Sequence, residues 1–97
     1  SAGLSAGIAE LAPGGGRLEL HRHAPPEVYH VLAGTGVVIV DDDRFEVAPG
    51  STVYIPGHAW HAIGNSGHGA LRLFYCFPTD RFADVVYQYA SDSHATG

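Results

Sequence analysis

Short segments of alternating apolar and polar residues run along this chain, with breaks about every eight to twelve residues. In residues 18–23, for example, the apolar Leu18 and Leu20 lie on either side of the polar Glu19. A period of two places successive side chains on opposite faces, so these segments predict half-buried β-strands. The predicted strands cover residues 8–11, 18–23, 27–32, 37–40, 44–47, 51–55, 59–63, 71–77 and 85–89.

Proline and glycine clusters mark the breaks between these strands, and no segment has a convincing helical period. This spacing favours an all-β barrel or sandwich. The sequence contains neither a linker nor an internal repeat, so we expect one domain over residues 1–97. Residues 91–97 are expected to form a polar tail.

Strand pairing follows from the turn signals. We expect residues 27–32 to pair with residues 18–23, and residues 51–55 to form a hairpin with residues 59–63. The triple aspartate at residues 41–43 is expected at a solvated hairpin tip. It lacks the glycine and the distal glutamate of a calcium loop.

Charge and composition narrow the possible partners. The 97 residues include 10 acidic and 5 basic side chains, a formal net charge of −5, which argues against a nucleic-acid partner. No apolar run is long enough to span a bilayer, and no signal peptide is visible, so we expect no membrane partner. The single Cys76 excludes an internal disulfide and fits a reducing cytoplasm.

His21 and His23 are the first candidates for chemistry. Residues two apart in a strand share a face, so both imidazoles are expected to point the same way. Glu27 begins the next predicted strand, and Tyr29 lies on the same face as Glu27. Two imidazoles and a carboxylate can form a metal site with open coordination positions, whereas an isolated His-x-His pair is more often solvated.

His61 becomes a fourth candidate ligand if its strand turns it toward the same interior. Three imidazoles and one carboxylate suit one divalent transition metal ion, which these ligand types leave open as iron, nickel, manganese or zinc. His30 is expected on the opposite face of its strand, and His68 and His94 are expected to be exposed in a loop or the tail. His58 is expected in a loop, either exposed or at the rim of the pocket.

At these spacings the chain resembles the cupin family. The family's first motif reads here as Gly15, His21, His23, Glu27 and Gly34. Its second motif reads as Gly50, Pro56, His61 and Asn65, with His58 where the family has glycine. The resemblance covers residues 4–89 and implies a single-domain barrel, the jelly-roll double-stranded β-helix, with His21, His23, Glu27 and His61 as metal ligands. Gly15, Gly34, Gly36 and Gly50 are expected to be turn residues with positive φ.

Within this family the chain looks most like the small lyases that cleave dimethylsulfoniopropionate. The resemblance lies in residues 3–5, in residues 9–15, in the first motif, and in residues 77–82 with Tyr87 beyond. It implies that Tyr29 and Tyr87 lie at the metal and take part in catalysis. It also implies an N-terminal segment before the barrel, which this sequence does not include, so a wall of the site or a dimer arm is expected to be missing.

The implied reaction is a β-elimination on a small-molecule carboxylate substrate, with Tyr29 as the base. A cationic sulfonium group favours aromatic faces, so Trp60 and Tyr75, with Phe74, are candidate substrate-binding residues. Strand alternation allows only some of them to face inward, and a tryptophan next to His61 is more often a core residue. The same ligands would also serve a metal-dependent dioxygenase, an isomerase or cyclase, or a non-catalytic binding protein. The apolar residues 71–77 leave an outer face to cover, which predicts a homodimer.

Overall fold

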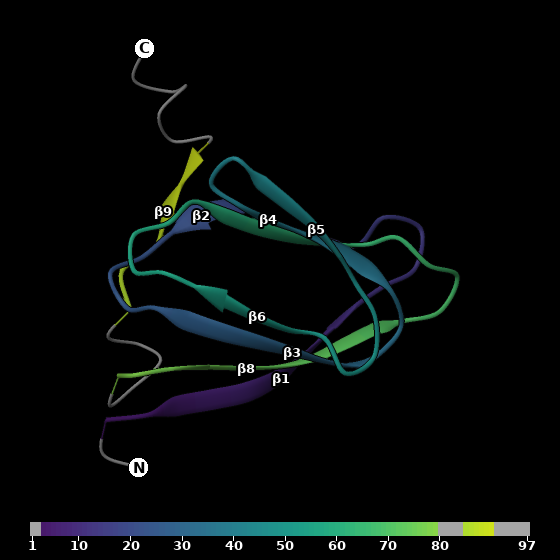
Figure 1. Cartoon of the computed structure of the whole chain (residues 1–97), viewed down its shortest axis with the longest axis horizontal. Helices are drawn as coiled ribbons and strands as arrows, with labels where there is room; N and C mark the ends of the chain where they lie inside the picture. Colours follow the sequence, from purple (N-terminus) through teal and green to yellow (C-terminus); the bar gives the residue numbers. More distant parts are fainter. Residues whose placement is uncertain (1–2, 80–84, 91–97) are drawn as a thin grey trace.

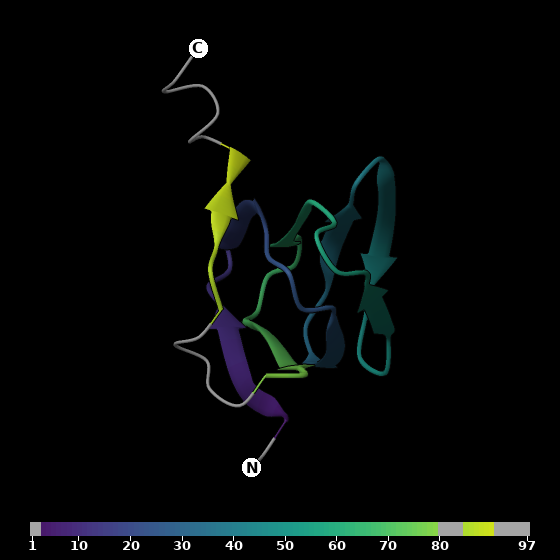
Figure 2. The same ribbon diagram turned by 90° about the vertical axis from the view of Figure 1, so that its left-hand side faces the viewer.

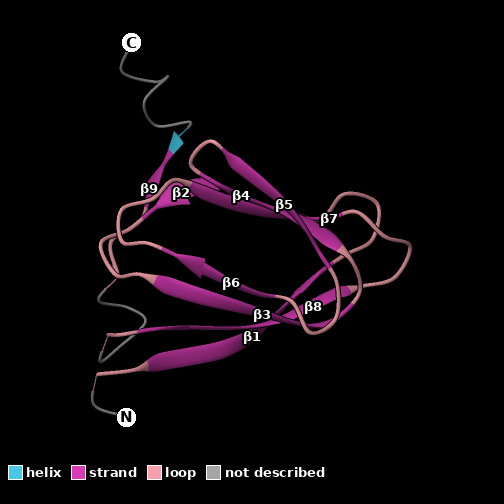
Figure 3. Ribbon diagram, viewed as in Figure 1, coloured by secondary structure: helices cyan, strands magenta, loops and turns pink. Residues whose placement is uncertain are grey.

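The computed structural model describes residues 3–79 and 85–90. Its strands are β1 (Ser5–Leu11), β2 (Arg17–Arg22), β3 (Glu27–Ala33), β4 (Gly36–Val40), β5 (Asp43–Val47), β6 (Thr52–Ile55), β7 (His61–Asn65), β8 (Leu71–Phe77) and β9 (Gln88–Tyr89). The all-β prediction is therefore confirmed (Figure 3). In the part of the chain described, no helix is long and apolar enough to cross a membrane. The predicted turn at residues 78–81 falls partly, and the polar tail entirely, outside the described residues.

Two antiparallel sheets face each other (Figure 1). One has the order β1-β8-β3-β6, and the other has the order β5-β4-β7-β2-β9. The edge strands β1 and β9 lie on the same side of the molecule, one below the other (Figure 2). The chain therefore forms the predicted jelly-roll type of barrel, in which consecutive strands commonly switch sheets.

This switching overturns two predicted pairings. Strand β2 pairs with β7 and β9 and not with β3, which belongs to the other sheet. Strands β6 and β7 do not form a hairpin, because β6 pairs with β3 in one sheet while β7 pairs with β2 and β4 in the other. By contrast, the hairpin of β4 and β5 around the aspartate tip is confirmed.

The core fills the space between the two sheets. Val38, Ile55, Leu71 and Leu73 are completely buried, and they come from both sheets. Apolar residues thus line the two inner faces, as the alternating pattern predicted.

Strand β2 contains a bulge that the sequence pattern did not reveal. Leu18 is opposite Ile63, and His21 is opposite His61, so three steps along β2 match two along β7. A bulge inserts an extra residue and changes the direction of neighbouring side chains. Leu18 and His21 therefore both oppose buried residues of β7, where strict alternation would have placed them on opposite faces.

Gly36 differs from the other glycines that were expected to be turn residues. Gly15, Gly34 and Gly50 have the predicted positive φ, whereas Gly36 does not and lies inside β4. A Cβ at Gly36 would lie 2.6 Å from the carbonyl oxygen of Gly64. Close packing against β7, and not a turn, is therefore the reason for glycine here.

Asn65 connects three backbone segments from a buried position at the end of β7. Its amide nitrogen donates to the carbonyl oxygens of Leu11 (2.9 Å) and Gly69 (2.8 Å), and its amide oxygen accepts from the N–H of Gly67 (2.9 Å). We expect Asn65→Ala to reduce the free energy of unfolding by about 2–4 kcal/mol, because it leaves these backbone groups without partners. Urea denaturation measures this change, and Ser66→Ala at the exposed neighbour is the control. Equal stabilities of the two variants would contradict this role.

Candidate metal centre

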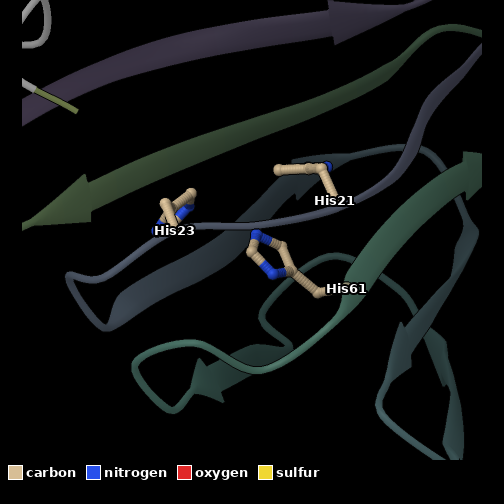
Figure 4. A group of neighbouring side chains, drawn as sticks. All are labelled: His21, His23 and His61. Carbon is tan, nitrogen blue, oxygen red and sulfur yellow. The ribbon is translucent and has the colours of Figure 1, made fainter. Parts of the chain in front are cut away.

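Three imidazoles converge between the sheets (Figure 4). His21 comes from β2, His23 follows the end of β2, and His61 begins β7. One nitrogen of each ring lies within 4.8 Å of those of the other two. All three side chains are buried, with 5%, 3% and 1% of their surfaces exposed respectively. The structure therefore brings together the three histidines that the sequence proposed.

Each ring is held by its other nitrogen. The Nδ1 atoms of His21, His23 and His61 hydrogen-bond the backbone carbonyl oxygens of Glu19 (2.6 Å), Pro25 (2.9 Å) and Ala59 (2.8 Å). A carbonyl oxygen only accepts, so Nδ1 carries the proton in each ring. This tautomer leaves Nε2 as the atom available to a metal, and the backbone contact fixes the ring orientation as in known metal sites.

Glu27 brings a carboxylate from β3 to the same group. Its Oε1 lies 3.0 Å from Nε2 of His23 and 3.3 Å from Nε2 of His61. Burial opposes the charged form of Glu27, but the hydrogen bond from His23 and the nearby charges of His61 and His23 outweigh it, and the pKa of Glu27 is lowered. The site therefore holds one negative charge among three imidazoles.

His23 and His21 respond differently to this charge. Burial alone would lower the pKa of His23, but its hydrogen bond to Glu27 and the charge of Glu27 raise it. The pKa of His21 is lowered, chiefly by burial and further by the charges of His61 and His23. Protons and a metal cation would thus compete at Nε2 of His23, which faces the carboxylate directly.

The nitrogen Nε2 of His61 is the strongest indication of a bound cation. Among the buried side-chain polar atoms of the described residues, it alone has no hydrogen-bond partner, although Oε1 of Glu27 lies 3.3 Å away. An orphaned buried polar atom is costly unless something outside the chain satisfies it. A divalent transition metal bound by imidazoles and a carboxylate fits this donor set.

A cavity of about 650 Å³ opens beside the cluster. Its wall includes His21, Glu27, Tyr29, Tyr75, Tyr87 and Tyr89. The ring centroid of Tyr87 lies 5.5 Å from that of His21 and 5.2 Å from that of His23. Tyr29, Tyr75 and Tyr87 were predicted near the site, and all three face this cavity.

The two predicted catalytic tyrosines are strongly perturbed. Burial first, then the charges of Glu27 and Tyr87, raises the pKa of Tyr29 well above its ordinary value near 10. Burial first, then the charges of Glu27, Tyr89 and Tyr75, raises the pKa of Tyr87 to about 12. Protein groups alone therefore keep both phenols protonated at neutral pH, and a nearby cation would favour the phenolate.

Trp60, a predicted substrate-binding residue, is not among the residues that line the cavity. The structure places the guanidinium carbon of Arg22 4.5 Å from the centre of the Trp60 ring, and Arg22 in turn donates to the Gln88 side chain at 2.9 Å. This contact is outside the described lining of the cavity, as is Phe74, which is 37% exposed on β8. Trp60 points away from the cavity because it is adjacent to His61, and adjacent residues in an extended chain face opposite ways.

Tyr89 and Glu19 are cavity residues that the sequence interpretation missed. Tyr89 is two residues beyond Tyr87, and Glu19 is two residues before His21. Two-residue spacing from a predicted site residue was therefore the available signal.

His58 occupies the turn where the family motif has glycine. Its φ is +64°, and its N–H donates to the carbonyl oxygen of His23 at 2.8 Å. A left-handed conformation strains a residue with a Cβ, so we expect His58→Gly to increase the free energy of unfolding by about 0.5–1 kcal/mol. His68→Gly, at an exposed loop residue without positive φ, is the control and is expected to lower stability slightly. Thermal denaturation of both variants tests this; destabilisation by His58→Gly would contradict it.

Comparison with known proteins agrees with this geometry. Residues 7–77 match the family model described as the cupin domain. The dimethylsulfoniopropionate lyase DddW of Ruegeria pomeroyi is 39% identical over 87 residues, which cover 90% of this chain and 56% of that protein. This chain spans between 45% and 61% of the length of the curated relatives it matches.

Solved structures show the same architecture. A cupin 2 domain-containing protein from Halorhodospira halophila superposes with a TM-score of 0.82 at 30% identity, covering 98% of this chain and 64% of that one. Oxalate decarboxylase of Lactobacillus farciminis, solved as a formate complex, gives a TM-score of 0.84 at 27% identity, covering 99% of this chain and 29% of that one. The resemblance drawn from the two sequence motifs is confirmed.

Proposed function

Because this chain belongs to the cupin domain family, we propose that it is a metal-dependent lyase that performs β-elimination on a small carboxylate such as dimethylsulfoniopropionate. The observation that carries the proposal is the 39% identity to a dimethylsulfoniopropionate lyase over 90% of the chain. The convergence of three imidazoles beside a tyrosine-lined cavity supports it.

His21, His23, Glu27 and His61 are the residues that would hold the metal ion. The bound ion would supply Lewis acidity, which acidifies the proton next to a substrate carboxylate. Glu27 also keeps the site from accumulating positive charge, since its carboxylate lies within 3.3 Å of two of the imidazoles.

Tyr29 is the proposed base. It is 2% exposed and lines the cavity on the same strand face as Glu27, two residues away. Its phenolate oxygen would remove the α-proton of the substrate; the pair of electrons from that C–H bond forms the Cα=Cβ bond, and the C–S bond breaks with its electrons on sulfur. The products are acrylate, dimethyl sulfide and a protonated Tyr29, which returns its proton to water.

Tyr87 is the proposed second catalytic residue. Its ring is stacked on that of His21, with an interplanar angle of 27°. Burial and neighbouring charges raise its pKa to about 12, which favours the protonated phenol as a hydrogen-bond donor to an anionic substrate oxygen. Tyr87 therefore orients the substrate, while Tyr29 acts on the proton.

Headspace detection of dimethyl sulfide from the metal-loaded chain tests the lyase directly. We expect dimethyl sulfide and acrylate in equal amounts, at the same rate with and without oxygen, because elimination consumes no oxidant. Turnover that requires oxygen would indicate the dioxygenase instead. Absence of dimethyl sulfide at high enzyme concentration would refute the lyase.

We also propose that the protein is a homodimer that covers the outer face of the β1-β8-β3-β6 sheet. Ile8, Tyr54 and Phe74 are 53%, 63% and 37% exposed on this face, and Ile8 is the register partner of Phe74. An apolar sheet face of this kind favours association with a second copy. We propose the cytoplasm as the compartment, because a single cysteine, Cys76, fits a reducing environment.

Light scattering at increasing concentration tests the dimer. Phe74→Glu is expected to give a monomer, because it buries a charge in the interface. Phe45→Glu, at a residue 45% exposed on β5 in the other sheet, is the matched control and is expected to remain dimeric. A monomeric wild-type protein would contradict the proposal.

A further inference from the structure

Two residues of the cavity wall, Glu19 and Tyr89, have no part in the chemistry described above. Glu19 lies on β2 two residues before His21, and Tyr89 on β9 is the register partner of His21. Both line the cavity together with Tyr87. This wall therefore continues directly from a proposed ligand.

Several aromatic rings line this part of the cavity. The rings of Tyr87 and Tyr89 are stacked, with centroids 6.3 Å apart and an interplanar angle of 20°. The ring of Tyr89 also lies 5.7 Å from that of His21. Tyr75 faces the same cavity, and Gly7 makes room for it, because a Cβ at Gly7 would collide with the Tyr75 hydroxyl.

The charged groups of this wall are Glu19 and Arg17. The Nε of Arg17 lies 3.1 Å from Oε1 of Glu19, and the two side chains are 66% and 69% exposed. A solvated ion pair of this kind is weak, so Glu19 can offer its carboxylate to a ligand at little cost. Aromatic faces beside a carboxylate favour a large, weakly hydrated cation over an anion or a neutral group.

We propose that Tyr89 and Glu19, with the stacked ring of Tyr87, form a subsite for the onium end of the substrate. The ligand class is a carboxylate that carries a sulfonium or quaternary ammonium group a few bonds away. The inference rests on the proposed function in one respect, since it assumes that the carboxylate end of the ligand lies at the histidine cluster.

Isothermal titration of the metal-loaded full chain with two probes tests this subsite. The onium probe is 3-(trimethylammonio)propanoate. Its isostere is 4,4-dimethylpentanoate, which keeps the carboxylate and replaces the cationic trimethylammonium group by an uncharged tert-butyl group. Wild-type protein is expected to bind the onium probe about tenfold more tightly. Tyr89→Leu and Glu19→Gln should each reduce this preference, whereas Tyr89→Phe, which retains the aromatic face, should preserve it.

Three further variants test the role of Glu19 and provide controls outside the cavity. Arg17→Gln is expected to strengthen onium binding about twofold, because it removes the partner that competes for Glu19. Tyr54→Leu and Glu46→Gln, at exposed residues outside this cavity, are the matched controls and should leave the preference unchanged. Weaker onium binding in Arg17→Gln would count against the subsite.

The outcomes separate this inference from the lyase proposal. Equal affinity for the two probes, no binding of either, or an unchanged preference in Tyr89→Leu would overturn the subsite, even if dimethyl sulfide is released. A clear onium preference without release of dimethyl sulfide would support the subsite while refuting the lyase.

Discussion

Replacing His61 by alanine is expected to remove the bound metal and to reduce dimethyl sulfide release to background. His61 is 1% exposed, and its Nε2 is a buried nitrogen without a hydrogen-bond partner. Loss of a residue that merely orients a ligand lowers metal affinity by about 10–100-fold, so loss of a ligand should cost more than about 100-fold. Elemental analysis after dialysis against limiting metal measures the metal content per chain.

His30→Ala provides the matched control for this experiment. His30 lies on β3, where its Nδ1 is hydrogen-bonded to the Thr52 hydroxyl at 2.7 Å, outside the histidine cluster. This variant is expected to keep its metal and its activity. A folded His61→Ala protein that retains stoichiometric metal would show that His61 is not a ligand.

Replacing Tyr29 by phenylalanine should have the second largest effect. The substitution keeps the buried ring and removes only the hydroxyl, so the fold and the metal content are expected to persist. Removing a general base typically lowers the rate by about 10²–10⁴-fold. The measurement is the initial rate of dimethyl sulfide release, normalised to metal content.

Tyr29 also packs in the hydrophobic core, which allows a purely structural role. Tyr29→Phe would be harmless to catalysis in that case, and full activity would remove Tyr29 as the base. Tyr54→Phe, at a tyrosine 63% exposed on β6, is the control and should leave the rate unchanged. A similar loss in both variants would point to a general effect on folding.

The strands were predicted well because glycine and proline clusters mark their ends, and because segments such as residues 18–23 alternate with a period of two. Two pairings were predicted wrongly, since β2 and β3, and likewise β6 and β7, are neighbours in sequence but lie in different sheets. Turn residues indicate where a strand ends, not which sheet the chain enters next. The bulge between Leu18 and His21 was also hidden, because it depends on register with β7.

The candidate site was predictable where spacing and strand geometry agreed. His21, His23 and His61 were identified by the two motifs, and the structure gathers them within 4.8 Å. Trp60 was chosen for its chemistry alone, and its place against Arg22 depends on a contact between distant strands. Glu19 was not singled out, because nothing in the sequence distinguishes a cavity-lining carboxylate on a strand from a solvated one.

Titration of the metal-depleted chain with a divalent metal, while the rate of dimethyl sulfide release is recorded, tests the proposed metal-dependent lyase most directly. The single histidine cluster found among residues 3–79 and 85–90 predicts a rate that rises linearly with added metal and stops rising at one equivalent. A rate that is independent of metal, or no dimethyl sulfide at any ratio with any of the four candidate metals, would contradict it.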